Sequence, residues 1–298
     1  MSATSAASAG VAPSGQGVTP GSRPGVKLKA RSQAASLLTA SLARGQVEIL
    51  QFFRSRDAVV FTLALPVVML ALLASILSGH VKGTNVTYSQ VYTTGLLAGG
   101  LASTSFLNLG ISIATERENG TLKRLAGTPM PRAAYFLGKV MVVLVASILE
   151  VVVLIVIGHI AYSVQFPGSL QRWWVFIWVT LLGGTAMTLL GVACSSIPRT
   201  ARSAAAVLNL PFLVLEFISG VFVPFNQIPH TLMTIAGFFP LRWLAEAYRS
   251  ALLPSFIQNV ELGGRWNQGE MALVLAIWCV VSLVVAVRTF RWTGRGER

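Results

Sequence analysis

Two carboxylates stand inside strongly apolar stretches of the sequence. Glu150 lies near the middle of an apolar run over 136–162, and Glu216 lies in another over 204–224. A carboxylate within a membrane is costly unless it is paired, protonated or hydrated, so each is a candidate for function. They could line a transport path, attract a cationic or amphipathic substrate, or bind a proton. A structural hydrogen bond to another span, for example to Asn209, is the alternative.

A stripe of small polar residues accompanies the carboxylates. Ser105, Asn108, Ser112 and Thr115 lie three or four residues apart in the apolar run 91–115, so a regular helix would place them on one face. Lipid offers such groups no hydrogen-bond partners, so this face should meet protein or a hydrated path. The predicted substrate path comprises Ser105, Asn108, Ser112, Glu150, Asn209 and Glu216.

The elements that must position these residues are membrane spans. Only 11% of the 298 residues are charged, whereas soluble domains carry about a quarter. Six apolar runs, each with the ~20 residues needed to span a bilayer, predict an all-α polytopic membrane protein with six transmembrane helices. They cover residues 58–78, 91–115, 136–162, 173–194, 204–224 and 271–290. Both cysteines fall inside such runs, so we expect no disulfide and no metal site.

The distribution of basic residues predicts the orientation. Eighteen of the 23 Lys and Arg residues fall in the tails and alternate loops on one side, and five fall on the other. The richer side should be cytoplasmic, which places both termini in the cytoplasm and suits a multi-pass protein of the plasma (inner) membrane. Because topology already explains the net charge of +13, we expect no nucleic-acid partner.

The beginning of the chain differs from the rest. Residues 1–41 are rich in Ser, Ala, Gly and Pro and contain no acid, which predicts a disordered cytosolic tail whose bases contact membrane lipid. An organelle transit peptide is the alternative. An amphipathic pattern over 42–57 then predicts an interfacial helix, so the membrane domain is assigned to residues 42–298.

A charged segment at 116–139, ERENGTLKRLAGTPMPRAAYFLGK, separates the second and third runs. Gly120 and Thr121 suit the start of a short helix, on which Leu122 and Leu125 share one face. The two leucines would form an apolar knob on a polar loop, as expected of an element that inserts into a groove on a soluble partner. An ordinary positively charged loop with a surface helix is the alternative.

Prolines interrupt the segment 216–253, which follows the fifth run. The stretch Thr231 to Phe239 is too short to cross the bilayer, so it should enter from the outer side and return, with protein around it. A further helix should start at Pro240. An ordinary loop with an interfacial helix is the alternative. The predicted outer re-entrant motif comprises Gly220, Pro224, Pro229, Pro240, Trp243, Glu246 and Arg249.

Both segments resemble one known family, the type-2 permease subunits of ATP-binding-cassette (ABC) exporters, which include daunorubicin- and multidrug-resistance permeases. The cytoplasmic loop of that family carries the pattern E-R-E-x-G-T-L-x-R-L-x-x-T-P. The second segment resembles the family pattern S-G-V-F-x-P-x-x-x-I-P, then P-L-x-W-x-x-E-A-x-R. The resemblance assigns ATPase coupling to Glu116, Arg117, Glu118, Gly120, Thr121, Leu122, Arg124, Leu125, Thr128 and Pro129.

The resemblance implies a permease that pairs with a second permease, identical or related, and with separate ATPase subunits. ATP and Mg would bind the ATPase, whose movement would expel a hydrophobic or amphipathic drug, antibiotic or lipid outward. The sequence lacks the phosphate-binding motif G-x-x-x-x-G-K-[ST], so we expect no catalytic residue and no cofactor on this chain, which would not itself be an enzyme.

Three alternatives keep the topology but change the function. The substrate could be a lipid-linked glycan or an envelope lipid within the same family. The chain could be an ATP-independent secondary transporter that uses Glu150 and Glu216 as proton sites. It could also be a membrane scaffold that recruits soluble proteins through the loop at 116–139.

Overall fold

The computed structural model describes residues 33–76, 79–81, 83–223, 227–260, 264–290 and 292. Within these residues the regular structure is helical, apart from one isolated bridge between His80 and Thr87. Six helices are long and apolar enough to cross a membrane, which confirms the predicted all-α fold with six spans. They are α2 (Arg56–Ile76), the continuous helix of α3 (Tyr88–Ala102), η1 (Ser103–Asn108) and α4 (Leu109–Glu118), then α6 (Arg132–Tyr162), α7 (Leu170–Cys194), α8 (Ala201–Ile218) and α11 (Gln268–Thr289).

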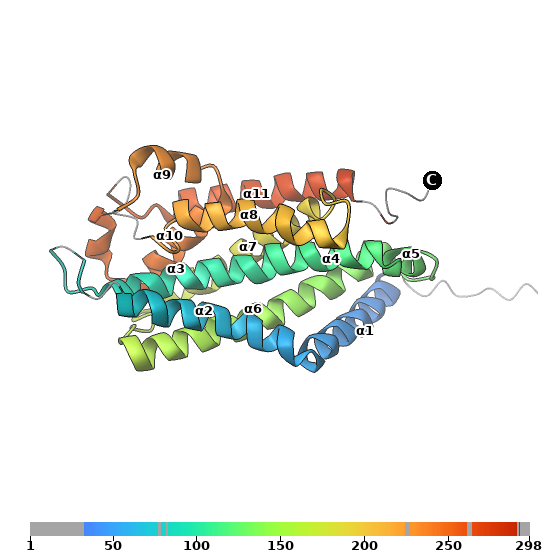
Figure 1. Cartoon of the computed structure of the whole chain (residues 1–298), viewed down its shortest axis with the longest axis horizontal. Helices are drawn as coiled ribbons and strands as arrows, with labels where there is room; N and C mark the ends of the chain where they lie inside the picture. The colour runs from blue at the N-terminus through green and yellow to red at the C-terminus, as the bar shows by residue number, and fades with distance from the viewer. Residues whose placement is uncertain are drawn as a thin grey trace, which may run out of the picture.

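The spans lie side by side in an elongated bundle (Figure 1). The short helix α5 (Thr121–Ala126) lies at one end of the bundle, which we call the α5 end. The helices α9 (His230–Ala236) and α10 (Pro240–Leu252) lie toward the opposite end, followed by the short helix η3 (Ser255–Val260). Because consecutive spans alternate in direction, the loops before α6 and α8 meet at the α5 end.

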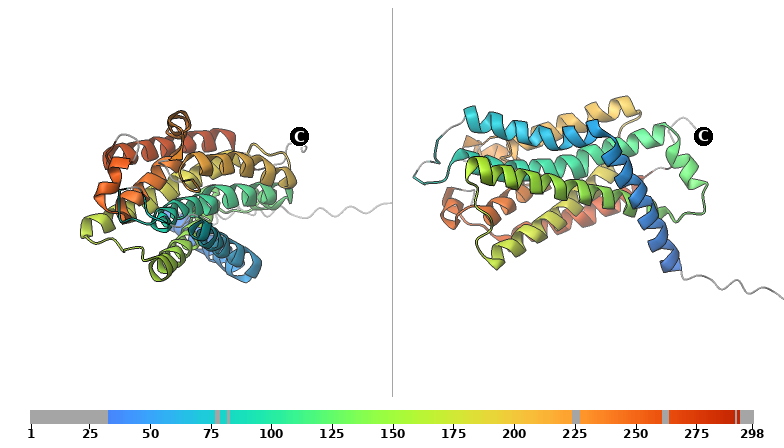
Figure 2. Two further views of the ribbon diagram at one scale, coloured as in Figure 1. Left: turned by 60° about the vertical axis from the view of Figure 1, so that its left-hand side comes forward. Right: turned by 90° about the horizontal axis from the view of Figure 1, so that it is seen from below.

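Helix α1 (Gln33–Arg54) crosses α6 at an angle and projects from the bundle (Figure 2). Glycines permit this close crossing, because a Cβ added to Gly138 of α6 would lie 2.6 Å from Cγ of Arg44. The helix begins before the predicted boundary at residue 42, so part of the segment assigned to a disordered tail is helical. Residues 1–32 of the tail predicted over 1–41 lie outside the described residues, and the division of the chain into domains stays a prediction.

A π-helical turn, η1, interrupts the second span between α3 and α4. A π-helix holds more residues per turn than an α-helix, so residues spaced three or four apart across it do not keep one common face. Ser105 lies within η1 and is fully buried, whereas Asn108 at its end is exposed. The predicted continuous stripe is therefore broken at Ser105, because the prediction assumed a regular α-helix.

The fifth span ends earlier than predicted, at Ile218, and the chain turns at Gly220 with a φ of 78°. Glycine adopts this left-handed conformation without the steric cost that a Cβ would add. Pro224 lies outside the described residues. Helix α10 begins at Pro240 as predicted and is buried on nearly every side, packed against α3, α7 and α11. It is an internal helix of the bundle, whereas the re-entrant path through a membrane stays a prediction.

Candidate functional site

A cleft with a volume of about 670 Å³ opens between α1, α2, α6, α8 and the η1–α4 part of the second span. We call it the central cleft. Four of the six residues predicted for a substrate path line it, and they come from three different spans. These four residues are Asn108, Ser112, Glu150 and Asn209.

The central cleft is amphipathic. Its α2 wall presents Phe61, Leu65 and Pro66, and Val142 of α6 continues the apolar surface. Phe61 and Leu65 are largely exposed, because few neighbours cover this side of α2. The cleft therefore combines an apolar wall that is open to the side with polar groups at its depth, an arrangement that suits a molecule with both characters.

Glu150 is the most deeply placed charged residue of the central cleft, with 2% of its surface exposed. Its Oε2 accepts a hydrogen bond from Thr104 Oγ1 over 2.7 Å. The carboxylate lies against Gly100, where even an added Cβ would overlap it. Among the described residues no basic side chain forms an ion pair with Glu150, so its carboxylate lies without a charged partner among the polar groups at the depth of the cleft.

Glu216 lies apart from the central cleft. It is buried on α8, and its Oε1 would lie 3.1 Å from a Cβ added to Gly99 of α3. The two carboxylates therefore flank α3 at the consecutive glycines Gly99 and Gly100. The predicted path, which used both carboxylates together with Ser105, does not form one cavity.

A buried group of charges closes the α5 end of the central cleft. We call Arg44, Glu48, Glu116 and Lys139 the ion cluster. Lys139 Nζ lies 2.9 Å from Glu48 Oε2, forms a close ion pair with Glu116, and donates to Ser112 Oγ over 3.2 Å. Arg44 pairs with Glu48, and the Tyr135 hydroxyl donates to Glu116 Oε2 over 2.7 Å. The cluster thereby joins α1, α4 and α6.

Sequence reasoning missed the ion cluster. Lys139 and Arg44 contributed to the prediction only as cytoplasmic bases, and Glu48 only as part of an amphipathic pattern. A signal was nevertheless present, because Lys139 falls within the apolar run 136–162, where a charged residue calls for a named partner.

The three charged residues that open the 116–139 segment turn toward the bundle. Glu116 belongs to the ion cluster. Arg117 Nη2 donates to the backbone oxygens of Ser195 and Pro198, over 2.8 and 3.0 Å. The carboxylate of Glu118 accepts a hydrogen bond from the backbone N–H of Ala201, where a helix start favours negative charge. Each residue thus fastens the loop to a different element.

Helix α5 itself corrects the prediction of a two-leucine knob. Its start is as expected, with Gly120 as N-cap at a φ of 70°. Leu122, however, is 0% exposed and packs inward against Ile113 and Tyr135. Leu125 is half-buried. The knob was expected because the sequence does not show that an apolar recess of the same chain lies beneath α5. The residues that α5 and the following turn expose are Lys123, Arg124, Ala126, Gly127, Thr128 and Pro129.

The predicted outer motif fastens α9 to α10. Trp243 Nε1 donates to the Gly237 backbone oxygen and Arg242 Nη1 to that of Met233, each over 2.7 Å. Glu246 lies 3.8 Å from Arg242, and Arg249 is 1% exposed. The three charged residues of α10 therefore lie inside the bundle, and Pro229 and Pro240 mark the starts of the two helices.

Comparison with known proteins places these features in context. YbhR of Escherichia coli K12, named as a multidrug ABC transporter permease, is 25% identical over 165 residues, or 55% of this chain and 43% of YbhR. YvfS of Bacillus subtilis, named as a transport permease, is 21% identical over 194 residues, or 65% of this chain and 77% of YvfS. The permease ycf38 of Porphyra purpurea is 27% identical over 169 residues, or 55% of this chain and 56% of ycf38. The match thus spans less than half of YbhR and about half of ycf38.

A family model described as ABC-2 type transporter matches residues 41–253. The matched region begins within α1 and ends just after α10, so it contains the ion cluster, helix α5 and all the spans that line the central cleft. It also accounts for well over half of the chain. The chain therefore belongs to the ABC-2 type transporter family.

Proposed function

We propose that the chain is the permease subunit of an ATP-driven exporter in the plasma membrane. A separate ATPase would bind ATP and Mg, and this chain would move a hydrophobic or amphipathic substrate outward. A drug, an antibiotic or a lipid each fits this description. Family membership and the permease names of the relatives support the proposal.

The observation that carries the proposal is that the central cleft shares residues with the 116–139 segment, which we call the coupling segment. Glu116 and Lys139 line the cleft and belong to the ion cluster. Glu116 also lies on α4, only a few residues before α5. A displacement of α5 would therefore move α4, and the ion pair between Glu116 of α4 and Lys139 of α6 would carry that movement to the cleft.

We propose that the ATPase contacts the exposed face of α5 and the turn after it. Arg124 and Ala126 of this face are exposed, and Lys123 adds a second base. The three inward contacts of Glu116, Arg117 and Glu118 would then transmit the movement to α6, to the turn before α8, and to α8. Two permeases, identical or related, would complete the exporter, with the α5 end in the cytoplasm.

Purification in mild detergent, followed by reconstitution with any ATPase that comes with the chain, tests the proposal. Uptake of a fluorescent amphipathic amine into inside-out vesicles should require ATP and fail with a non-hydrolysable analogue. Uptake driven by a proton gradient alone would overturn the proposal in favour of a secondary transporter. Retention of soluble proteins without transport under either condition would favour the scaffold.

A further inference from the structure

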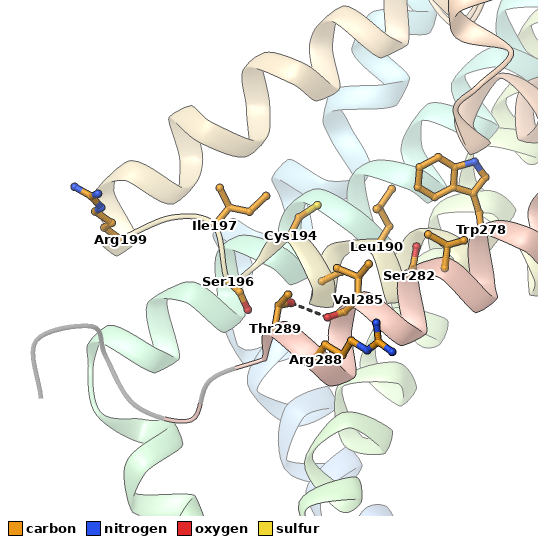
Figure 3. A pocket seen from close by; sticks show the side chains of 12 residues that line it. Leu190, Cys194, Ser196, Ile197, Arg199, Trp278, Ser282, Val285, Arg288 and Thr289 are labelled. Carbon is orange, nitrogen blue, oxygen red and sulfur yellow. Dashed lines mark hydrogen bonds between the residues drawn. The ribbon is translucent and has the colours of Figure 1, made fainter. Parts of the chain in front are cut away.

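A second cavity lies on the other side of the bundle from the central cleft, between α7 and α11 and the turn before α8 (Figure 3). Its volume is about 650 Å³, and we call it the lateral groove. Trp278, Val281 and Val285 of α11 and Leu190 of α7 give it an apolar wall. Val281 and Val285 are exposed, so the groove opens toward the surroundings of the bundle.

The charge of the lateral groove has one sign. Arg199 and Arg288 line it, and no carboxylate does. Both arginines are exposed, and among the described residues neither has an ion-pair partner. Such a site, basic at one end and apolar along its length, has the chemistry that attracts an anionic amphiphile.

A buried hydroxyl provides a second, independent observation. Ser282 is 2% exposed, lines the groove, and its Oγ has no hydrogen-bond partner among the described residues. Thr289 on the same helix satisfies its own hydroxyl by donating to the Val285 backbone oxygen over 2.7 Å (Figure 3). A hydroxyl between membrane helices lacks water, so a partner for Ser282 is expected from a bound molecule.

The order of these groups along α11 matches the order of groups in a phospholipid. Trp278, Ser282 and Arg288 follow one another toward the α5 end, and Arg288 lies about 9 Å beyond Ser282 at the rise of an α-helix. The long arginine side chain can reach back over part of this distance. An acyl chain along Trp278 and an ester oxygen at Ser282 would thus each meet a complementary group. The phosphate would lie between Arg199 and Arg288, which line opposite sides of the groove and whose exposed side chains would turn toward it (Figure 3).

We propose that the lateral groove binds an anionic phospholipid of the leaflet that borders the α5 end, which is the cytoplasmic leaflet in the orientation proposed above. The bound lipid would also affect the coupling segment. The turn before α8 forms the rim of the groove, and Arg117 holds this turn through the backbone oxygens of Ser195 and Pro198. A phosphate bound to Arg199 restrains this turn and thereby steadies the junction of α4 and α5.

Cys194 provides a readout within the groove. It is a free, partly exposed thiol that lines the cavity, whereas Cys279 is free but lies outside the lining. The purified chain is treated with N-ethylmaleimide in micelles that contain dioleoylphosphatidylglycerol or dioleoylphosphatidylcholine, and alkylation of both cysteines is followed by peptide mass spectrometry. The anionic lipid should slow the reaction of Cys194 several-fold relative to the zwitterionic lipid, with no such difference at Cys279.

Equal protection by the two lipids would overturn the proposal, since it would show general lipid contact. Protection of Cys194 by inorganic phosphate alone would overturn it in favour of a site for free anions. Because these measurements use the unaltered chain and no transport assay, they stand apart from the proposed function.

Variants test the groups assigned to the head group. The double change Arg199→Gln with Arg288→Gln should abolish the difference between the two lipids, and Ser282→Ala should reduce it. The matched control, Arg54→Gln with Arg56→Gln, removes the same charge from exposed positions at the corner of α1 and α2 and should leave the difference intact. Loss of selectivity in the control as well would show that net charge, and not the groove, selects the lipid.

Discussion

Lys139 places one positive charge between two carboxylates in the interior of the bundle. Its side chain is 3% exposed and contacts Glu48 and Glu116. Removal of one partner from a buried ion pair leaves an uncompensated charge and costs about 3–5 kcal/mol. We expect Lys139→Met to lower the thermal stability of the detergent-solubilised chain markedly, as measured by fluorescence-detected size-exclusion chromatography after heating.

A double-mutant cycle separates the ion pair from the loss of the lysine side chain itself. In the background of Glu116→Gln, the change Lys139→Met should destabilise the chain less than it does alone, because one of the two orphaned charges is already gone. Additive effects of the two changes would show that the contact between Lys139 and Glu116 contributes nothing of its own.

We expect the carboxylate of Glu150 to favour positively charged substrates over neutral ones. Glu150→Gln keeps a group that can accept a hydrogen bond from Thr104 and removes the negative charge at the depth of the central cleft. Transport of a cationic amphiphile should fall by about tenfold or more, which corresponds to the loss of about 1.4 kcal/mol of interaction, whereas transport of a neutral analogue of the same size should change little. Transport of the cationic amphiphile and of its neutral analogue is measured in the same vesicles, and the two losses are compared. Equal losses for both compounds would assign Glu150 a structural role.

At the scale of single elements, helix α5 has two faces with different roles, whereas the sequence predicted a single apolar knob that binds a partner. Its buried face stabilises the loop, and its exposed face is available to a partner. We expect Arg124→Glu with Ala126→Glu to abolish co-purification of the ATPase while the chain stays folded, because both side chains are exposed. Co-purification followed by quantitative mass spectrometry gives the ratio of ATPase to permease. An unchanged ratio would exclude this face as the contact.

Leu122 should respond differently. Leu122→Ala opens a cavity beneath α5, and such changes cost about 2–5 kcal/mol in a packed core. The expected result is lower thermal stability, with binding of the ATPase reduced only to the extent that the loop is loosened. Arg54→Glu with Ser55→Glu, at two exposed positions where α1 ends, changes the charge by the same three units as Arg124→Glu with Ala126→Glu and serves as the control for that double change.

The elements were predictable from the sequence to very different degrees. The spans follow from apolar length alone, since a bilayer imposes one minimum length on every helix that crosses it. The direction of a single side chain depends on packing. The sequence does not reveal that η1 changes the helical period at Ser105, or that a recess beneath α5 receives Leu122. Glu48 meets Lys139 only because α1 crosses α6 at Gly138, a contact between distant segments.

For the whole molecule, the basic residues and the proposed sites lie at the same end of the bundle. The α5 end carries the ion cluster, the exposed face of α5 and the basic end of the lateral groove, whereas the opposite end carries α9 and α10. The bases that this arrangement gathers at one end are those that positive-inside counting assigns to the cytoplasm. Both cavities thus converge on the end at which an ATPase would act.

Orientation in the membrane is therefore the prediction on which the whole arrangement depends, and cysteine labelling in intact cells tests it. In a background of Cys194→Ser and Cys279→Ser, we introduce Ala126→Cys at the α5 end and Gln165→Cys in the loop between α6 and α7, both exposed positions. A membrane-impermeant maleimide should label residue 165 in intact cells, and residue 126 only after permeabilisation. The opposite orientation would place most of the 23 basic residues outside the cell, against the positive-inside rule. The reverse pattern would place α5 beyond the reach of a cytoplasmic ATPase and exclude the proposed exporter, and labelling of both positions in intact cells would contradict the six-span topology.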